Sequence, residues 1–287
     1  MSSSMYPQTF PVAGPVRLSV RHTAGDLTVV AADVTEIVVD LRPSRPGDEE
    51  ALEMIARTTV DVRGNAVRID VPRDHAWLSA HSTPAIDIEV TVPMGSSVDA
   101  ESGSADLRLE GELGAVVLKT GSGDIGVDHC ADVRVRTGSG DVRLGRTKTI
   151  GAKSGSGDIR VEEPVGEVVL DAASGDIGVD ATLTGGRVSS ASGDIAIGGI
   201  AGRVEIKTAS GDIAVRVASE GELTVKSASG DVSVGIPVGT AARLDVTSVS
   251  GGVHSQLDSS DAPAEADRKV LVSAQSISGS VTIARAE

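Results

Sequence analysis

The chain has 287 residues, of which 34 are glycine and only three are aromatic (Tyr6, Phe10 and Trp77), so any core must be built from Val, Ile, Leu and Ala. A content of 40% hydrophobic and 23% charged residues is typical of a folded protein and excludes disorder throughout. The 26 basic and 41 acidic side chains give a formal charge of −15, which opposes unspecific binding to nucleic acid or anionic lipid.

The start of the chain lacks the basic segment followed by an apolar one that a secretory signal carries. No uncharged apolar run reaches the roughly 18 residues that a transmembrane helix needs. The single cysteine, Cys130, cannot form an intramolecular disulfide. We therefore expect a cytoplasmic protein without a membrane span, and we leave a surface location open.

Residues 1–97 are expected to form β-strands, a hairpin and a cap over the first repeat. The stretch Ala24-Gly25-Asp26 begins a degenerate repeat unit. Further along, residues 48–57 suggest a short helical turn, residues 60–71 a hairpin around Gly64-Asn65, and residues 86–92 another strand. Such a segment covers strand edges that an open end of a repeat stack would expose.

Residues 98–287 are dominated by a repeat of Ser-Gly-Asp or a close relative, spaced by 17 to 19 residues. Positions eight and six before the aspartate and one and three after it are apolar, as Val204, Ile206, Ile213 and Val215 are around Asp212. This alternation, rich in β-branched residues, predicts two short strands per unit, each with one apolar face. The glycine before each aspartate is expected at a corner, because glycine tolerates positive φ.

The repeat predicts an all-β fold, a parallel β-solenoid of short rungs. One unit cannot bury its apolar face alone, but units stacked about 4.8 Å apart align their apolar positions into columns. The narrow interior also explains the missing aromatic rings, which would force neighbouring rungs apart. We expect a polar insertion at 257–269 to interrupt the stack before a last rung, Val270 to Ile283.

The recurring aspartates are the first candidate site, and we expect them mainly at structural turns. Charges about 4.8 Å apart repel by about 1 kcal/mol in water and by about 3 to 4 kcal/mol at an effective dielectric of 20. Exposure to solvent, Asx-type bonds to local backbone N–H groups, nearby basic side chains or bound cations could each compensate. Calcium is the less favoured reading, since it needs about six to eight oxygens. The weak calcium candidates are Asp124, Asp141, Asp158, Asp176, Asp194, Asp212 and Asp231.

Two further columns are candidate interaction surfaces. A partial basic column lies five residues before the aspartates and consists of Lys119, Arg136, Lys153, Lys207 and Lys226. Two residues after the aspartates the outward side chains are mostly small, as at Ala196 and Ala214, and such a flat face could accept a second copy of the chain or a partner. The Ser and Thr columns have no recurring His as a base, so we expect neither catalytic residues nor a cofactor.

The Ser-Gly-Asp series, the segment 235–246 and the final Ser278-Gly279-Ser280 resemble the bacterial "putative adhesin" family, a domain of unknown function built of β-strand repeats. The resemblance covers nearly the whole chain. It implies a single-stranded, right-handed parallel β-helix and brings no established reaction.

We therefore expect a non-enzymatic interaction or scaffold module that binds a protein or cell-envelope partner along its length. One alternative is a carbohydrate-active β-helix protein that uses clustered Asp. It predicts a carboxylate with a strongly raised pKa in a cleft, and the lack of aromatic rings for sugar stacking counts against it. The other alternative is a calcium-stabilised repeat protein, which would lose stability with a chelator.

Overall fold

The computed structural model describes residues 6–72, 84–257 and 268–286. Trp77 and most of the polar insertion expected at 257–269 lie outside the described residues. The chain divides into two compact units, Met1–Asp141 and Val142–Glu287. Almost all of the regular structure in the described ranges is β-strand.

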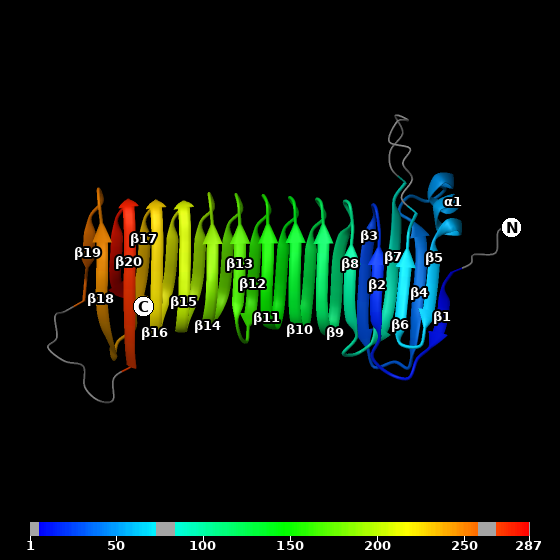
Figure 1. Cartoon of the computed structure of the whole chain (residues 1–287), viewed down its shortest axis with the longest axis horizontal. Helices are drawn as coiled ribbons and strands as arrows, with labels where there is room; N and C mark the ends of the chain where they lie inside the picture. Colours follow the sequence, from blue (N-terminus) through cyan, green and yellow to red (C-terminus); the bar gives the residue numbers. More distant parts are fainter. Residues whose placement is uncertain (1–5, 73–83, 258–267, 287) are drawn as a thin grey trace. The chain divides into compact units, whose positions relative to one another are not determined.

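Over residues 6–72 and 84–141 the first unit has ten strands. Most of them run in two parallel columns (Figure 1). One column has the order β6–β2–β8–β9 and the other β7–β3–β9, with β10 following β9. Three antiparallel pairings, β5–β6, β4–β7 and β1–β4, complete its outer end. The strands are β1 Gln8–Pro11, β2 Arg17–Arg21, β3 Asp26–Ala32, β4 Glu36–Pro43, β5 Thr59–Arg63, β6 Ala66–Asp70, β7 Ile86–Pro93, β8 Ser97–Glu101, β9 Asp106–Thr120 and β10 Ile125–Thr137.

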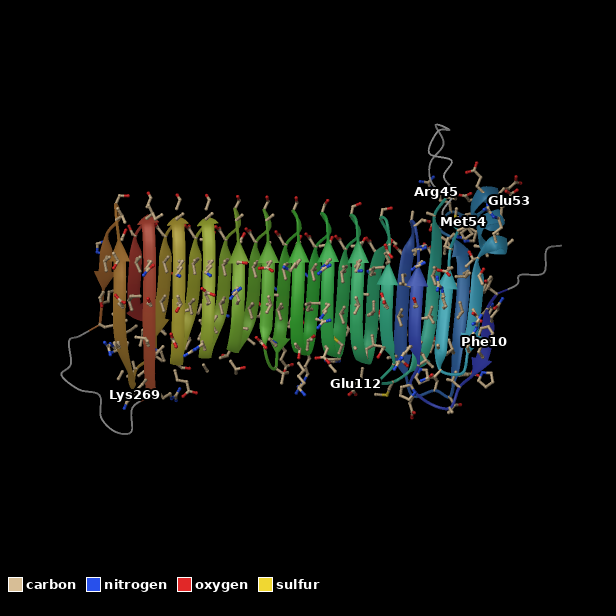
Figure 2. The ribbon with its side chains drawn as sticks, in the orientation of Figure 1. Phe10, Arg45, Glu53, Met54, Glu112 and Lys269 are labelled. Carbon is tan, nitrogen blue, oxygen red and sulfur yellow. The ribbon has the colours of Figure 1, made fainter. Side chains whose placement is uncertain are left out.

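Helix α1, Glu49–Arg57, forms where a helical turn is expected. It begins because the Asp48 carboxylate accepts the backbone N–H of Ala51 at 2.9 Å, which satisfies a donor that would otherwise lack a partner. Its apolar side buries Ala51, Met54 and Ile55, and the helix packs beside β4 (Figure 2). The hairpin expected around Gly64-Asn65 is β5–β6.

The second unit is a stack of parallel rungs whose strands stand side by side (Figure 1). Four strands, at 142–154, 177–190, 195–210 and 213–229, each run from one Ser-Gly-Asp corner to the next. In these strands the short strand after one corner is continuous with the short strand before the next, where the alternation predicts two separate ones. The backbone pairing continues through the turn, with shifts in register between Val179 and Thr182 and between Ile200 and Ala201. The strands are β11 Val142–Ser154, β12 Ile159–Pro164, β13 Val168–Ala172, β14 Ile177–Ser190, β15 Ile195–Ser210, β16 Ile213–Ser229, β17 Val232–Ile236, β18 Thr240–Ser248, β19 Val253–Ser255, β20 Arg268–Ser278 and β21 Val281–Arg285.

The interior of each rung holds the apolar columns that the repeat predicts. The residue that directly follows each aspartate position pairs in register with its counterpart in the next rung. In the second unit each of these residues has at most 1% of its surface exposed. They are Ile177, Ile195, Ile213, Val232 and Val281. Tyr6 and Phe10, the two described aromatic residues, both precede the repeats. The expected β-solenoid is confirmed.

The order of the rungs at the end of the second unit differs from the expected one. Strands β20 and β21 pair with β16 and β17 on one side and with β18 and β19 on the other. The outermost rung is therefore residues 240–255, and the expected last rung, Val270 to Ile283, lies one layer inside it. In the first unit β3 likewise lies between β7 and β9, and β2 between β6 and β8. The repeat period specifies which side chains face inward but not which rung lies beside which.

Candidate functional site

The recurring aspartates form a ladder of hydrogen bonds between rungs. In the second unit the N–H of Asp212 donates to Oδ1 of Asp194 at 2.8 Å. The same bond, at 2.7–2.8 Å, links each aspartate to the next rung, along the series Asp158, Asp176, Asp194, Asp212, Asp231 and Ser280. In the first unit the N–H groups of Asp124 and Asp141 donate at 2.9 Å to Asp106 and Asp124.

In this series each carboxylate accepts a donor of the neighbouring rung, a compensation that was not among those considered from the sequence. The ladder aspartates are exposed, so water screens the repulsion between neighbouring carboxylates. One oxygen of each carboxylate already accepts a backbone N–H in this arrangement. Among the residues that the structure describes, no group of three His, Cys, Asp or Glu side chains is placed to hold a metal ion.

One ladder residue was missed in the sequence. Oδ1 of Asp87 accepts the N–H of Asp26 at 3.1 Å, so Asp87 occupies the ladder position of the rung that contains β7. It lacks the preceding Ser-Gly, but Ile88 and Val90 follow it at the apolar positions of the repeat, and that signal could have found it. Burial, and then the charges of Asp87 and Asp106, raise the pKa of Asp26.

The corner glycines are required chiefly by the close approach of the backbone. A Cβ on Gly193 would lie 2.0 Å from the carbonyl oxygen of Gly175, and a Cβ on Gly175 would lie 2.1 Å from that of Gly157. Neither glycine has a φ in the left-handed region. In the second unit only later corners adopt the expected positive φ, for example +140° at Gly211 and +125° at Gly230, while in the first unit Gly25 has a φ of +113°. The absence of a side chain is therefore the shared requirement, and positive φ is a local one.

The two kinds of corner use their hydroxyl residues differently. At the earlier kind the N–H of Gly193 donates to Oγ of Ser190 at 2.8 Å, and the N–H of Gly157 donates to Oγ of Ser154 at 2.9 Å. At the later kind the N–H of Gly230 donates instead to the carbonyl oxygen of Ser278 in the next rung, at 3.1 Å. In this column the hydroxyls of Thr208, Ser227 and Ser276 have no partner among the described residues, and all three are buried and in register. The bonded hydroxyls of Ser154 and Ser190 therefore support their corners, whereas the unbonded ones do not.

The basic column lies on the sheet face formed by the strand segments before each corner. In the first unit Lys119 pairs in register with Arg136. In the second unit the column runs Lys153, Asp171, Ser189, Lys207 and Lys226, so an acid and a serine interrupt it. Lys153 lies 2.8 Å from the carboxylate of Asp171, and Lys207 lies 2.6 Å from that of Glu205.

These ion pairs lower the pKa values of two acids on this face, Asp171 and Glu205. Burial alone would raise the pKa of Asp171, but hydrogen bonds from Lys153 and Ser189 outweigh it and lower that pKa. The pKa of Glu205 is lowered chiefly by its hydrogen bond with Lys207, with Arg187 adding to the effect. Much of the charge on this face is therefore neutralised within the face itself.

The small-residue column lies on the opposite run of each rung, after the corner. Ala196 pairs in register with Gly178 on one side and with Ala214 on the other, and Ser233 and Thr282 continue the column. Ala196, Ala214 and Ser233 are exposed. From Gly178 to Ser233 the outer surface is a flat strip of backbone and short side chains, and beyond Gly178 the column continues with Arg160 and Arg143.

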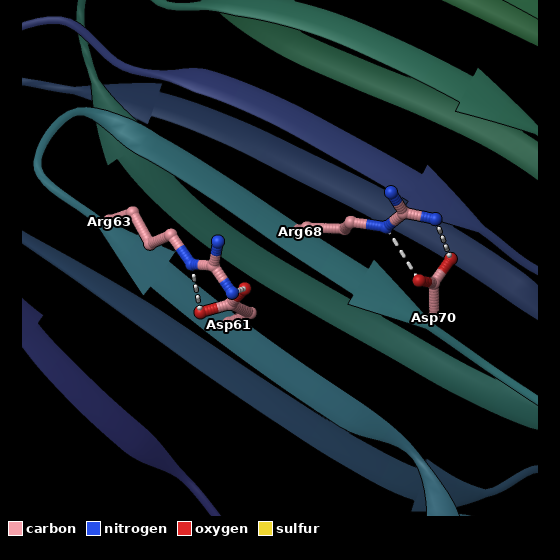
Figure 3. A network of polar contacts seen from close by, with 4 residues as sticks. All are labelled: Asp61, Arg63, Arg68 and Asp70. Atoms are coloured by element: carbon pink, nitrogen blue, oxygen red, sulfur yellow. Dashed lines mark hydrogen bonds and ion pairs between the residues drawn. The ribbon is translucent and has the colours of Figure 1, made fainter.

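Concave features of the described surface are shallow. The larger is a groove of about 550 Å³ over β2, β5 and β6. Four of its charged side chains form two ion pairs, Arg63 with Asp61 at 2.9 Å and Arg68 with Asp70 at 2.5 Å (Figure 3), and Arg17 lines it as well. The smaller groove, of about 230 Å³, holds Asp26, Asp40, Arg42 and Asp87.

The sequence model of the Toastrack DUF4097 family matches residues 16–287. The chain belongs to the Toastrack DUF4097 family. This membership confirms the resemblance found in the repeats, and it supports a general interaction or scaffold role for this Toastrack chain. Among the described residues no helix is both long enough and apolar enough to cross a bilayer.

Solved structures similar to this Toastrack chain carry descriptive names only. One, a "putative lipid binding protein" from Parabacteroides distasonis, is 16% identical over 98% of this chain and 97% of its own, with a TM-score of 0.45. A "putative adhesin" from Bacteroides fragilis is 12% identical over 97% and 96%, with a TM-score of 0.39. Another from Parabacteroides merdae is 10% identical over 97% and 95%, with a TM-score of 0.40. No curated protein matches the chain.

Proposed function

We propose that this Toastrack chain is a non-enzymatic scaffold that binds a protein or cell-envelope partner along an outer sheet face. The observation that carries the proposal is the flat strip of Gly178, Ala196, Ala214 and Ser233, whose members repeat at the spacing of the rungs. A partner with a flat surface can approach these four positions closely, because their own side chains are short. The strip ends at Gly178, since the next residue in register is Arg160.

The absence of a reaction is part of the proposal, and the regularity of the ladder supports it. An active site needs a local departure from the repeat that brings an acid, a base or a nucleophile together. The ladder bonds of the second unit instead keep one geometry from Asp158 to Ser280. In the larger groove of the first unit two arginines are paired with carboxylates, Arg63 with Asp61 and Arg68 with Asp70.

The opposite face is the less suitable surface for an acidic partner. Its lysines at 153 and 207 already have carboxylate partners, and an incoming acid would have to replace Asp171 or Glu205. Exchange of one exposed ion pair for another yields little free energy, since such pairs contribute about 0–1 kcal/mol. We therefore place the partner on the small-residue strip.

The test introduces bulk and charge on that strip in the full chain. Ala196→Lys and Ala214→Lys should abolish capture of the partner in a pull-down from the native host, with folding checked by circular dichroism. Thr224→Lys, on the opposite face, is the matched control and should retain capture. Capture that survives both strip variants would reject this surface.

The proposed cytoplasmic location is tested separately. Cells that carry a tagged chromosomal copy are fractionated, and intact cells are treated with protease. A tag protected in the cytosolic fraction is the expected result. A tag removed from the outside would reject the location and direct the search to surface ligands.

A further inference from the structure

The outermost rung of the second unit ends in an open strand edge. Among the described residues β18 pairs only with β20, and β19 only with β21. The outward backbone N–H and C=O groups of Thr240–Ser248 therefore face no strand. An edge of this kind is a template for pairing with another chain.

The apolar interior is also open at this rung. Val272 and Ala274, one layer inside, are fully buried, whereas their register partners Leu244 and Val246 are only half-buried. Val253 in β19 has 47% of its surface exposed, against 0% for Val281 beneath it. Another rung stacked here would bury these side chains as every inner rung does.

The outer strands of the first unit carry protection that β18 lacks. Strand β1 ends at Pro11, which cannot donate to a ladder. In β5, Arg63 already pairs with Asp61 at 2.9 Å. Strand β18 contains no proline, and its two charged residues, Arg243 and Asp245, are exposed with no ion pair found among the described residues.

We propose that this edge pairs with the same edge of a second copy of the chain, antiparallel and centred on Leu244. In that register each Arg243 lies opposite Asp245 of the other copy, so two ion pairs form by symmetry. The same register places Ala242 opposite Val246 and Leu244 opposite itself. The apolar interior then continues through the junction, and its inward parity is kept. This inference goes beyond the proposed function and does not depend on it.

The test measures the dimer by sedimentation equilibrium on the full chain. We expect a monomer–dimer equilibrium that weakens with salt. Arg243→Glu and Asp245→Arg should each raise the dimer dissociation constant by about tenfold or more, because each change turns two attractive pairs into repulsive ones. The double variant Arg243→Glu with Asp245→Arg restores complementarity, so its dissociation constant should return to within about threefold of the wild type.

The matched control is Lys226→Glu, which makes the same charge change two rungs inside the stack and should leave the dimer unaltered. A wild-type chain that stays monomeric at about 100 μM would overturn the proposal. A dimer that resists both single variants would overturn it as well. Loss of the dimer in Ala214→Lys, with the edge variants unaffected, would assign self-association to the small-residue strip instead.

Discussion

Two serines at equivalent positions in the second unit should respond to alanine substitution with opposite signs. Ser190 and Ser227 each have 6% of their surface exposed. Ser190 Oγ accepts the N–H of Gly193 at 2.8 Å and donates to the carbonyl of Gly175 at 3.3 Å. Ser227 Oγ has no partner among the described residues, because Gly230 donates its N–H to the next rung.

The magnitudes follow from what each substitution leaves behind. Ser190→Ala leaves the buried N–H of Gly193 without an acceptor, which costs about 1–3 kcal/mol. Ser227→Ala removes a buried hydroxyl that makes no bond, so the folded state should gain up to about 1–3 kcal/mol. Because the lost volume is the same in both, the free energies of unfolding of the two variants should differ by about 2–6 kcal/mol.

Equilibrium urea unfolding followed by circular dichroism measures this difference, and calorimetry gives an independent one. Each kcal/mol should move the midpoint temperature by about 2–4 °C for a unit of this size. Equal destabilisation by both substitutions would refute the reasoning, since it would mean that the Ser227 hydroxyl has a partner and that the two corner types are equivalent.

Four further outcomes are expected. Asp194→Ala should lower the midpoint of urea unfolding by removing the acceptor for the Asp212 N–H, at a cost of about 0.5–1.5 kcal/mol, whereas Asp194→Asn retains an acceptor oxygen and should be nearly neutral. Gly193→Ala should destabilise the folded chain by several kcal/mol, because the new Cβ would lie 2.0 Å from the carbonyl oxygen of Gly175, where ordinary contact begins at 3.4 Å. Gly178→Ala should be neutral or stabilising, because the atom nearest to its Cβ lies at 4.0 Å. EDTA should leave the melting temperature unchanged, and a fall would revive the calcium reading. Burial lowers the pKa of His22 from 6.5 to about 4, so between these pH values the unfolded chain binds the proton and the folded chain does not. As pH falls through this range the free energy of unfolding should drop by up to about 1.4 kcal/mol per pH unit, and His22→Leu should remove this contribution.

The sequence was sufficient to predict the side-chain columns, because inward positions must be apolar at a period of two along each strand. Ile177, Ile195 and Ile213 stack as their spacing predicts. The same logic locates the aspartates but not their bonds. Whether a carboxylate accepts a donor from its own turn or from the following rung depends on the distance between stacked backbones, and that distance is set only once the rungs are assembled.

The order of the rungs at the ends could not be predicted for a related reason. Residues 240–255 and 268–285 present the same apolar columns, so either segment could pair with β16 and β17. Local sequence does not distinguish the two stacks. The choice depends on pairing between residues far apart in the chain, as with Asp26 and Asp106.

The inside position of the final strands affects how the stack frays. The rung that can detach first, residues 240–255, is joined at one side to β17 and at the other to the segment leading into β20. It would detach as a closed loop, and a loop gains less entropy than a tail of equal length. We expect hydrogen exchange at β20 and β21 to be slower than at β18 and β19, which cover them.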